Sequence, residues 1–473
     1  MLRNPGMLRV LRHHNYRMWA GANFMSMIGS WTQVMGVNWL LLSVSGSATS
    51  LGLGLFLQSA PGLLMTFAGG SLADRLPARP LVAAGHALHG TLAVVLAVMV
   101  FTGVDSVWPV YAVALVGGVL PSLYFPALGR FGAEVVGPDD LPDALSLGAV
   151  ITSVGRVLGM GLAGVLIPVA GTGGLFVIDA LGFAVVVAAI CLMRGGELHP
   201  LPRAAAEDSG AVAGLRYIGR TRWLLVLLLF ALVLGALSRN YQVTMTTMSQ
   251  GPLQAGAAGY GTLSVVFGAG AVIGGLYAVL RRRLTFPVLF AAAALTAVGQ
   301  AAGGAMPGLL PFAAVLLPVG ASAVILDTTI GARLQLGTDP RMRGRVLAAQ
   351  SMVTGAAGAL GGPLLGVLCD ALGPRAALTG AGLAASAAVC AAALAMAGAL
   401  GHRLRLPAVA SITAALVPPR GFRRPRRTAP VRPVRPHAAR RARRPVPSRR
   451  VPAAPPARSS GPARRPRPGR HPA

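Results

Sequence analysis

The sequence predicts an all-α membrane protein, with twelve transmembrane helices in two six-helix bundles and a disordered C-terminal tail. Three observations lead to this fold class. Only 12% of the 473 residues are charged and 54% are hydrophobic, whereas about a quarter of the residues of a soluble domain are charged. Apolar stretches long enough to cross a bilayer recur along the chain. Arginines concentrate on every second connection between these stretches.

A short basic segment, residues 1–16, precedes the first apolar stretch. That stretch is too long for the core of a signal peptide, and similar stretches follow it, so we expect a retained first span. Each stretch can cross ~30 Å of hydrocarbon at about 1.5 Å per residue, and backbone in lipid must satisfy its own hydrogen bonds. We therefore expect helices near 17–43, 50–73, 81–102, 107–128, 144–168, 173–193, 223–247, 258–280, 286–305, 309–334, 346–368 and 376–399.

Residues 194–222 form the longest internal connection. They divide the spans into an N-terminal bundle over 17–193 and a C-terminal bundle over 223–400. From Ala205 to Arg222, apolar residues and arginines follow the pattern of an amphipathic helix, which we expect at the cytoplasmic membrane surface. Two groups of six spans suggest two similar halves around a central cavity.

The tail, residues 401–473, holds twenty of the 42 arginines and no acidic residue. It cannot bury enough apolar surface to fold, so we expect it to be disordered. Two interpretations stay open: a solvated tail without a specific role, and electrostatic contact with anionic lipid headgroups or RNA. The scarcity of aromatic residues argues against a specific nucleic-acid partner.

The arginines test the number of spans, because cytoplasmic loops are enriched in them. The connections between the arginine-bearing ones hold few charges, and a missed or invented span would break this alternation. It predicts a multi-pass protein of the inner or plasma membrane with both termini in the cytoplasm. The arginines fall at Arg75 and Arg79, at Arg130, from Arg194 to Arg222, from Arg281 to Arg283 and from Arg341 to Arg345.

A charged segment from Gly70 to Pro80 interrupts the apolar pattern. Asp74 is the first acidic residue of the chain, and its place at a helix end lets it reach water or an arginine. The segment resembles the loop Gly-x-Leu-x-Asp-Arg-x-Gly-Arg-Arg of major facilitator superfamily transporters. The matching residues are Gly70, Leu72, Asp74, Arg75 and Arg79, while Pro77 and Ala78 replace the loop's glycine and its next arginine.

The resemblance implies the major facilitator fold and a conformational latch made of Gly70, Asp74, Arg75 and Arg79. Asp74 would cap the end of a facing helix, or pair with an arginine, when the cytoplasmic side is closed. The alternative is a charge that only anchors the loop. In that case Asp74→Asn would leave turnover unchanged.

Further stretches resemble one branch of the superfamily, the transmembrane secretion effectors similar to the enterobactin exporter. The segment 144–168 carries Arg156, Gly159 and Gly164, similar to the glycine-rich motif of antiporters, although Met160 and Gly161 replace its usual Gly-Pro pair. The resemblance covers residues 15–400. Its other matching stretches are Asn15–Gly21, Ser26–Trp31, Gly259–Gly261, Gly268–Gly275, Arg343–Val346 and Gly361–Pro363.

The first span carries a polar stripe. Its members are three, four and three residues apart and so share one helical face. Such a stripe either lines a wet cavity or packs helices together, and the resemblance favours a cavity that binds substrate. Arg239 and Tyr241 in the span 223–247 are further cavity candidates. The stripe is Asn23, Ser26, Ser30 and Gln33.

Ionisable residues inside apolar spans cost free energy when charged, so they usually have a functional or pairing role. We expect Asp179 or Asp327 to take up the coupling proton, because a carboxylate removed from water accepts a proton more readily. The alternative is a fixed ion pair that holds helices together. His86 and His89 have no carboxylate or cysteine nearby, so we expect interfacial histidines and no metal site.

These observations predict a proton-coupled efflux antiporter that exports a small organic molecule, drug-like or siderophore-like, by alternating access. An uptake carrier or uniporter is the near alternative, and a non-transporting membrane scaffold or sensor acting through the basic tail is the distant one. We expect no enzyme and no cofactor, because the chain lacks lysine, and therefore a Walker phosphate loop, and has no nucleophile–base pair. The expected partners are the substrate, protons and the lipid bilayer, with the chain as a monomer.

Overall fold

The computed structural model describes residues 9–137, 140–199, 211–281, 284–339 and 342–399, with backbone alone at 66–71, 74 and 211–215. The predicted tail 401–473 and the segments 1–8 and 200–210 lie outside these ranges. Every regular element of the described part is a helix. In order they are η1 (Val10–Arg12), α2 (His14–Ser45), α3 (Ala48–Arg75), α4 (Ala78–Phe101), α5 (Val107–Val136), α6 (Leu141–Leu192), η2 (Gly195–Glu197), α7 (Ala211–Arg220), α8 (Arg222–Ser238), α9 (Tyr241–Gln250), α10 (Gly256–Leu280), α11 (Phe286–Gly304), α12 (Leu309–Gly337), α13 (Arg343–Leu372) and α14 (Pro374–Ala399).

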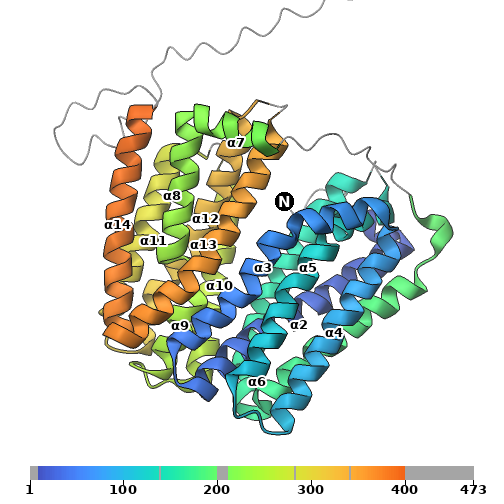
Figure 1. Ribbon diagram of the computed structural model, residues 1–473, viewed down its shortest axis with the longest axis horizontal. Coiled ribbons are helices and arrows are strands. Elements are labelled where there is room, and N and C mark those ends of the chain that lie inside the picture. Colours follow the sequence, from blue (N-terminus) through green and yellow to red (C-terminus); the bar gives the residue numbers. More distant parts are fainter. Residues whose placement is uncertain (1–8, 138–139, 200–210, 282–283, 340–341, 400–473) are drawn as a thin grey trace, which may run out of the picture. The chain divides into compact units, whose positions relative to one another are not determined.

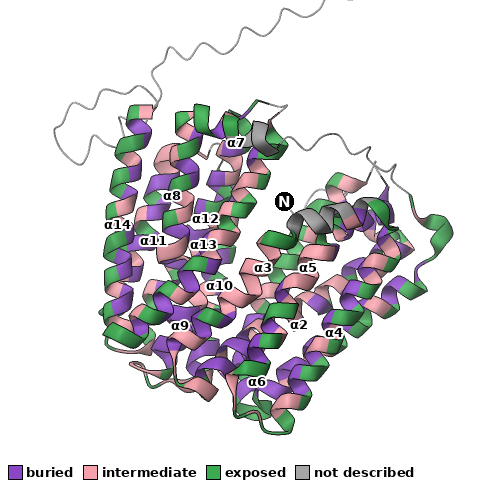
Figure 2. Ribbon diagram, viewed as in Figure 1, coloured by how far each residue is buried: buried purple, intermediate pink, exposed green. Residues whose placement is uncertain are grey.

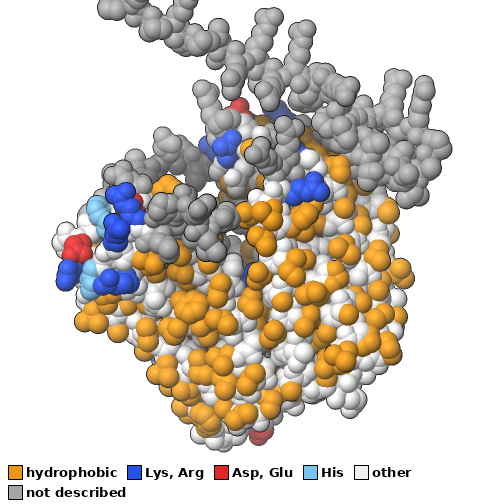
Figure 3. All heavy atoms as spheres, turned by 180° about the vertical axis from the view of Figure 1, so that it is seen from behind, with side chains coloured by type: hydrophobic (Ala, Val, Ile, Leu, Met, Phe, Trp, Pro, Cys, Tyr) orange, Lys and Arg blue, Asp and Glu red, His pale blue; other side chains and the backbone are white. Residues whose placement is uncertain are grey.

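The helices are built to face lipid. Among the described residues, ten helical stretches are long and apolar enough to cross a membrane. Large apolar side chains stay exposed on their outer faces, with Val169 at 81% and Leu310 at 79%. Hydrophobic side chains cover most of the helical surface seen in Figure 3. Buried residues line the inner faces of the helices in Figure 2. An exposed apolar surface of this extent indicates a lipid environment, so the protein is a multi-pass membrane protein.

The helices up to Ala399 form two groups, which Figure 1 shows in blue to green and in green to orange. We call α2 to α6 the N-terminal bundle and α7 to α14 the C-terminal bundle. Helix α7 covers part of the amphipathic helix expected over 205–222. Its Ile218 is only 6% exposed and packs with Leu224 of α8, so α7 is anchored in the core of the C-terminal bundle.

Helix α6 contains two of the expected spans, 144–168 and 173–193, within one 52-residue element. The two parts are separated at Gly171, whose backbone angles are φ 65° and ψ −178°. A side chain at Cβ disfavours this conformation, so glycine is the residue that lets the chain reverse here. The element is therefore two antiparallel helices joined at one residue.

The expected span 223–247 contains a break that the sequence did not predict. Helix α8 ends at Ser238 and α9 begins at Tyr241. The Asn240 side-chain amide donates to the backbone carbonyls of Gly235 and Ala236, each at 3.3 Å. A break in a membrane helix frees backbone carbonyls that lipid cannot satisfy, and Asn240 supplies the missing donor.

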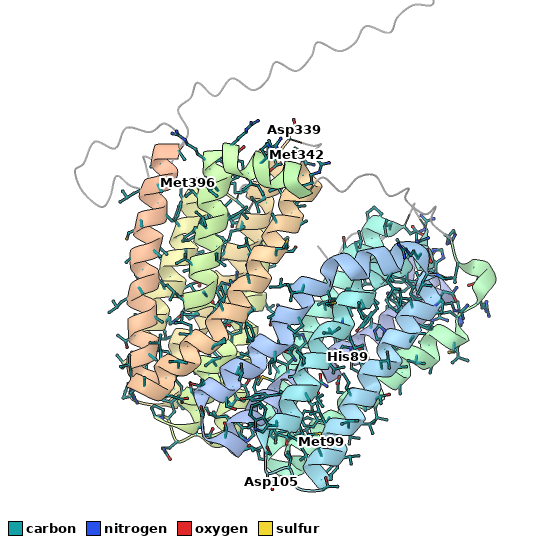
Figure 4. All side chains as sticks on the ribbon, viewed as in Figure 1. His89, Met99, Asp105, Asp339, Met342 and Met396 are labelled. Carbon is teal, nitrogen blue, oxygen red and sulfur yellow. The ribbon has the colours of Figure 1, made fainter. Side chains whose placement is uncertain are left out.

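The connections between helices lie at two opposite ends. Figure 4 marks Asp105 at one end and Asp339, Met342 and Met396 at the other. The alternation of arginines therefore corresponds to two physical ends of the helices. We call them the arginine-rich end, which holds Arg75, Arg79, Arg130, Arg194 and Arg281, and the arginine-poor end, which holds Gly46, Asp105, Gly251 and Gly373.

The two bundles pack against each other in their arginine-poor halves, α3 against α13 and α6 against α10. Glycines allow the backbones to approach closely. A Cβ on Gly164 or Gly261 would collide with the backbone of the other. Between these helices lies an apolar cluster that we call the interface core. Its buried residues include Met35 and Met160 of the N-terminal bundle and Met245 and Tyr260 of the C-terminal bundle.

A carboxylate from one bundle caps a helix of the other at the arginine-poor end. Asp370, near the end of α13, accepts hydrogen bonds from the backbone N–H groups of Ala48 (2.8 Å) and Thr49 (2.9 Å). The Ser47 hydroxyl donates to the same carboxylate at 2.6 Å. These groups form the first turn of α3, whose free N–H groups and dipole attract negative charge. The contact therefore holds the bundles together at this end.

We expect Asp370→Asn to weaken the contact between the bundles at the arginine-poor end, because the asparagine amide has one acceptor oxygen and no charge. A loss of about 1 kcal/mol is usual for such a cap and would raise opening roughly fivefold. A cysteine introduced in place of Leu51, which is 0% exposed and packs against residues of the other bundle, can report opening by its rate of maleimide labelling once Cys191, Cys369 and Cys390 are replaced by alanine.

Asp105→Asn is the matched control for this measurement, since Asp105 is an exposed acid at the same end. Faster labelling at the Leu51→Cys position in Asp370→Asn alone supports the cap. Equal rates in the two variants would show that Asp370 does not hold the bundles together.

Candidate functional site

A cavity of about 670 Å³ lies in the N-terminal bundle among α2, α3, α4, α5 and α6. Its volume is in the range of small-molecule binding sites. The four polar residues predicted as a stripe on the first span all lie in its wall. The polar side chains of the wall are Asn23, Ser26, Ser30, Gln33, Gln58, Ser59, His86, His89, Ser122 and Tyr124.

Helix α2 presents two different faces, which explains how the stripe reaches the cavity. Gly29 and Gly36 face α6, where a Cβ on Gly29 would approach the Asp179 Cα to 2.8 Å and one on Gly36 would press on Phe176. This close packing leaves the adjacent face, with Ser30 and Gln33, turned to the cavity. The glycines fix the position of α2, and the polar residues then line open space.

The cavity continues toward the arginine-rich end. A second hollow of about 430 Å³ shares Asn23, Phe125 and Leu128 with the first and extends to Tyr16, near the start of α2. On the opposite side, a hollow of about 30 Å³ shares Gln33 and narrows among apolar residues. Open space therefore leads from the cavity to the arginine-rich end.

The expectation that His86 and His89 are interfacial is wrong. They are 5% and 9% exposed and lie in the wall of the cavity; Figure 4 marks His89 midway along α4. His86 Nδ1 donates to the Val82 carbonyl (2.8 Å), and the Tyr124 hydroxyl lies 3.4 Å from His89 Nδ1. Both histidines lie near the middle of a 24-residue apolar helix, and this position in the sequence could have indicated that they are away from the membrane surface.

Asp179 lies in the interior of the N-terminal bundle and is 0% exposed. Neither of its carboxylate oxygens has a hydrogen-bond partner of good geometry, although the Ser30 hydroxyl lies beside it. A buried carboxylate without a partner is costly to keep ionised. The group is therefore the kind of side chain that can hold and release a proton.

Asp327 is in a different situation, because it forms an ion pair with Arg239. Arg239 lies at the break between α8 and α9, and Asp327 lies on α12. The two residues are 88 positions apart in the chain, so no local pattern in the sequence could pair them. The Asp327 side chain is 50% exposed and that of Arg239 is 23% exposed. The pair borders open space.

Tyr241 lies beside this pair, with its ring 4.5 Å from the ring of Phe267. It also lines a hollow of about 20 Å³ with Gln300 and Phe312. The structure therefore brings Arg239, Tyr241 and Asp327 together in the C-terminal bundle. The polar stripe of α2 belongs to the N-terminal bundle, so the predicted cavity residues form two sets on two bundles.

The residues of the antiporter-like motif pack α6 on both sides. A Cβ on Gly159 would approach the Ile28 carbonyl and Trp31 Cβ of α2, and Gly164 meets Gly261 of α10. Arg156 places its guanidinium 5.8 Å from the centre of the Trp31 ring. The glycines thus allow α6 to contact both bundles, and Arg156 lies close to the surface between them.

The predicted latch residues lie at the end of α3 and the start of α4. The side chain of Asp74 lies outside the described residues, Gly70 lies in α3, and Arg75 is exposed. Arg79 donates through one nitrogen to the backbone carbonyls of Ile190 (2.7 Å) and Met193 (3.0 Å) at the end of α6. Basic groups stabilise helix C-termini, so Arg79 ties α4 to α6 within one bundle.

The fold resembles solved membrane transporters. The nucleoside transporter NupG has a TM-score of 0.65 and 14% identity, with 81% of this chain and 99% of that chain covered. A bacterial homologue of the human lysosomal transporter Spinster, in an inward-facing and unoccupied conformation, has a TM-score of 0.58 and 13% identity, covering 87% and 97%. A POT family transporter bound to a thioalcohol-conjugated peptide has a TM-score of 0.63 and 11% identity, covering 79% and 94%.

The described helices share the fold of these major facilitator superfamily transporters, and a family match over most of the chain places the protein among the transporters of that superfamily. The profile of one family within it, the transmembrane secretion effectors, matches residues 6–435. The chain belongs to the transmembrane secretion effector family.

One curated relative is the Staphyloferrin A transporter of Staphylococcus aureus (strain NCTC 8325 / PS 47), 24% identical over 189 residues. The match covers 39% of this chain and 47% of that protein, so the chain matches about half the length of this relative.

We expect Arg79→Gln to lower thermal stability, because two or three carbonyls at the end of α6 lose their donor. The cost should be on the order of 1 kcal/mol, the size of a side-chain hydrogen bond in a membrane protein. Arg75→Gln, four residues earlier and exposed, is the control. Thermal unfolding of the purified protein in detergent measures both, and equal midpoints for the two variants would contradict an anchoring role for Arg79.

Proposed function

We propose that the protein is a twelve-span, proton-coupled exporter of a small organic molecule that works by alternating access. The observation that carries this proposal is the cavity of about 670 Å³, open toward one end of bundles that meet at the other. The cavity lies within the N-terminal half; rocking of the two halves would open and close the side from which it is reached, as alternating access requires. Binding would rely on the apolar surface of this cavity together with the polar side chains in its wall.

Two additions to the ten apolar stretches support the proposal of twelve spans. Helix α6 supplies two spans because it reverses at Gly171. Helix α2 has 32 residues, long enough to cross at about 1.5 Å per residue, and its polar stripe lowers its mean hydropathy. With the arginine-rich end in the cytoplasm, both termini are cytoplasmic and the described conformation is open to the cytoplasm.

Asp179 is our first choice for the proton-coupling site. It is buried and without a hydrogen-bond partner, whereas Asp327 is engaged with Arg239. Asp179 also lies against Gly29 of α2, the helix whose neighbouring face lines the cavity. Uptake of a proton by Asp179 would thus act on the helix that contacts the substrate.

Export of a drug-like or siderophore-like molecule is supported by the family's description as secretion effectors and by the name of the relative. The test is accumulation of a panel of labelled compounds in cells with and without the gene, repeated with a protonophore. Lower accumulation that the protonophore abolishes supports proton-driven export. Higher accumulation in cells with the gene would contradict export and indicate that the protein is an uptake carrier.

We expect Asp179→Asn to abolish protonophore-sensitive export while the protein still inserts and folds, because asparagine has nearly the same shape and cannot exchange a proton. Asp327→Asn serves as the comparison, and export by this variant should remain sensitive to the protonophore. Unchanged export in Asp179→Asn would eliminate Asp179 as the coupling site, and unchanged export in both variants would eliminate both carboxylates.

A further inference from the structure

Two arginines border the interface core from opposite bundles. Arg156 belongs to α6 of the N-terminal bundle, and Arg239 lies between α8 and α9 of the C-terminal bundle. Neither residue is used in the proposed proton uptake. Their position raises the question of what two guanidinium groups bind in the middle of a membrane protein.

The direction of Arg156 follows from its neighbours on α6. Gly155 and Gly159 face α2, and Val157 and Gly161 face α10. Met160, one turn further along, is buried in the interface core between the bundles. Residues four apart share a helical face, so Arg156 lies on the same face as Met160, one turn closer to the arginine-rich end, with its guanidinium near Trp31.

Arg239 borders the same core from the other side. Trp31, which contacts Arg156, packs against the interface core, and so does Tyr241, two residues after Arg239. Asp327 is close enough to interact electrostatically with both arginines, and it forms an ion pair with Arg239. The three charged groups therefore share one region between the bundles.

The charges in this region do not balance. Two guanidinium groups face one carboxylate, and Arg156 has no ion pair within 4.0 Å among the described residues. Asp179 does not neutralise it, because neither oxygen of Asp179 has a partner. Arg239 Nε is buried and makes no hydrogen bond in the described part of the chain. Positive charge in a membrane interior calls for a counter-anion, and the described residues supply only Asp327 for the two guanidinium groups.

We propose that the transported molecule is an organic anion whose carboxylate is bound by Arg156 and Arg239 from the two bundles. This inference rests on the proposed transport function. Guanidinium groups bind carboxylates through parallel hydrogen bonds, and Trp31 and Tyr241 offer aromatic surface for an adjacent ring or chain. Asp327 competes with the substrate for Arg239. The substrate carboxylate therefore displaces the Asp327 carboxylate from Arg239 when it binds.

The test uses the full-length protein purified in detergent, with benzoate and citrate as carboxylate probes and benzamide as the uncharged probe, all at constant ionic strength. The carboxylates should raise the midpoint of thermal unfolding and benzamide should not. Arg156→Gln should weaken the response to carboxylates about tenfold or more, the value of a charge-assisted hydrogen bond. Because Arg156 has no ion pair to lose, this variant should fold normally.

Two further variants separate binding from general destabilisation. Asp327→Asn removes the competing carboxylate, so we expect it to bind benzoate and citrate more tightly than the unmodified protein. Arg333→Gln is the control, because Arg333 lies on the same helix as Asp327 but stacks over Phe286 at 4.7 Å. An equal response to benzamide, no response to either carboxylate, or an equal loss in Arg333→Gln would overturn the proposal.

Failure of the proposed anion site can be distinguished from failure of the proposed transport function. If cells export neutral compounds in a protonophore-sensitive way and Arg156→Gln has no effect on binding, transport stands and the anionic substrate class is wrong. If carboxylates bind through Arg156 but no compound changes its accumulation in cells, the anion site stands and the transport function is wrong.

Discussion

The constraint on which the rest of this structure depends is that hydrocarbon offers no hydrogen-bonding partner. Every polar group within the spans must be satisfied by the protein or face a water-filled space. Asn240 meets this requirement where α8 ends, by donating to carbonyls that the break leaves free. The polar side chains of α2 meet it by lining the cavity. The carboxylate of Asp179 and the Nε of Arg239 are buried without a hydrogen-bond partner among the described residues, so neither group meets this requirement in the described conformation.

The second principle of the architecture is the small size of the residues where the bundles meet. Apolar side chains gain little by leaving lipid for a protein interface, so close packing must supply the attraction between membrane helices. Gly164 against Gly261 and Gly52 against Gly362 bring backbones of the two bundles together. Asp370 adds a polar contact at the arginine-poor end. Larger side chains such as Met160 and Tyr260 fill the interface core beside these glycine contacts.

The charged groups between the bundles would, in the proposed mechanism, link substrate binding to movement of the two bundles. Arg156 and Arg239 belong to different bundles, so an anion held by both would connect the two halves. Asp327 already occupies Arg239 in the described conformation. In the proposed mechanism, a substrate carboxylate would compete with Asp327 for Arg239, so the free energy of the site would depend on whether substrate is bound. Asp179, which lies against Gly29 of α2, would keep the proposed proton uptake separate from this exchange.

The sequence by itself determined the helical membrane class, the alternation of arginine-rich and arginine-poor connections, and the family, because hydrophobic length, charge distribution and motifs such as Gly70 to Arg79 are local in the chain. The face carrying Asn23, Ser26, Ser30 and Gln33 was also predictable, since helical spacing alone defines it. Only the tertiary structure decided that Arg239 meets Asp327, that Asp370 caps α3, that Arg79 caps α6, and that His86 and His89 are buried beside a cavity. Each of these depends on which helices pack together, and residues separated by 88 or 322 positions leave no local pattern that would reveal the contact.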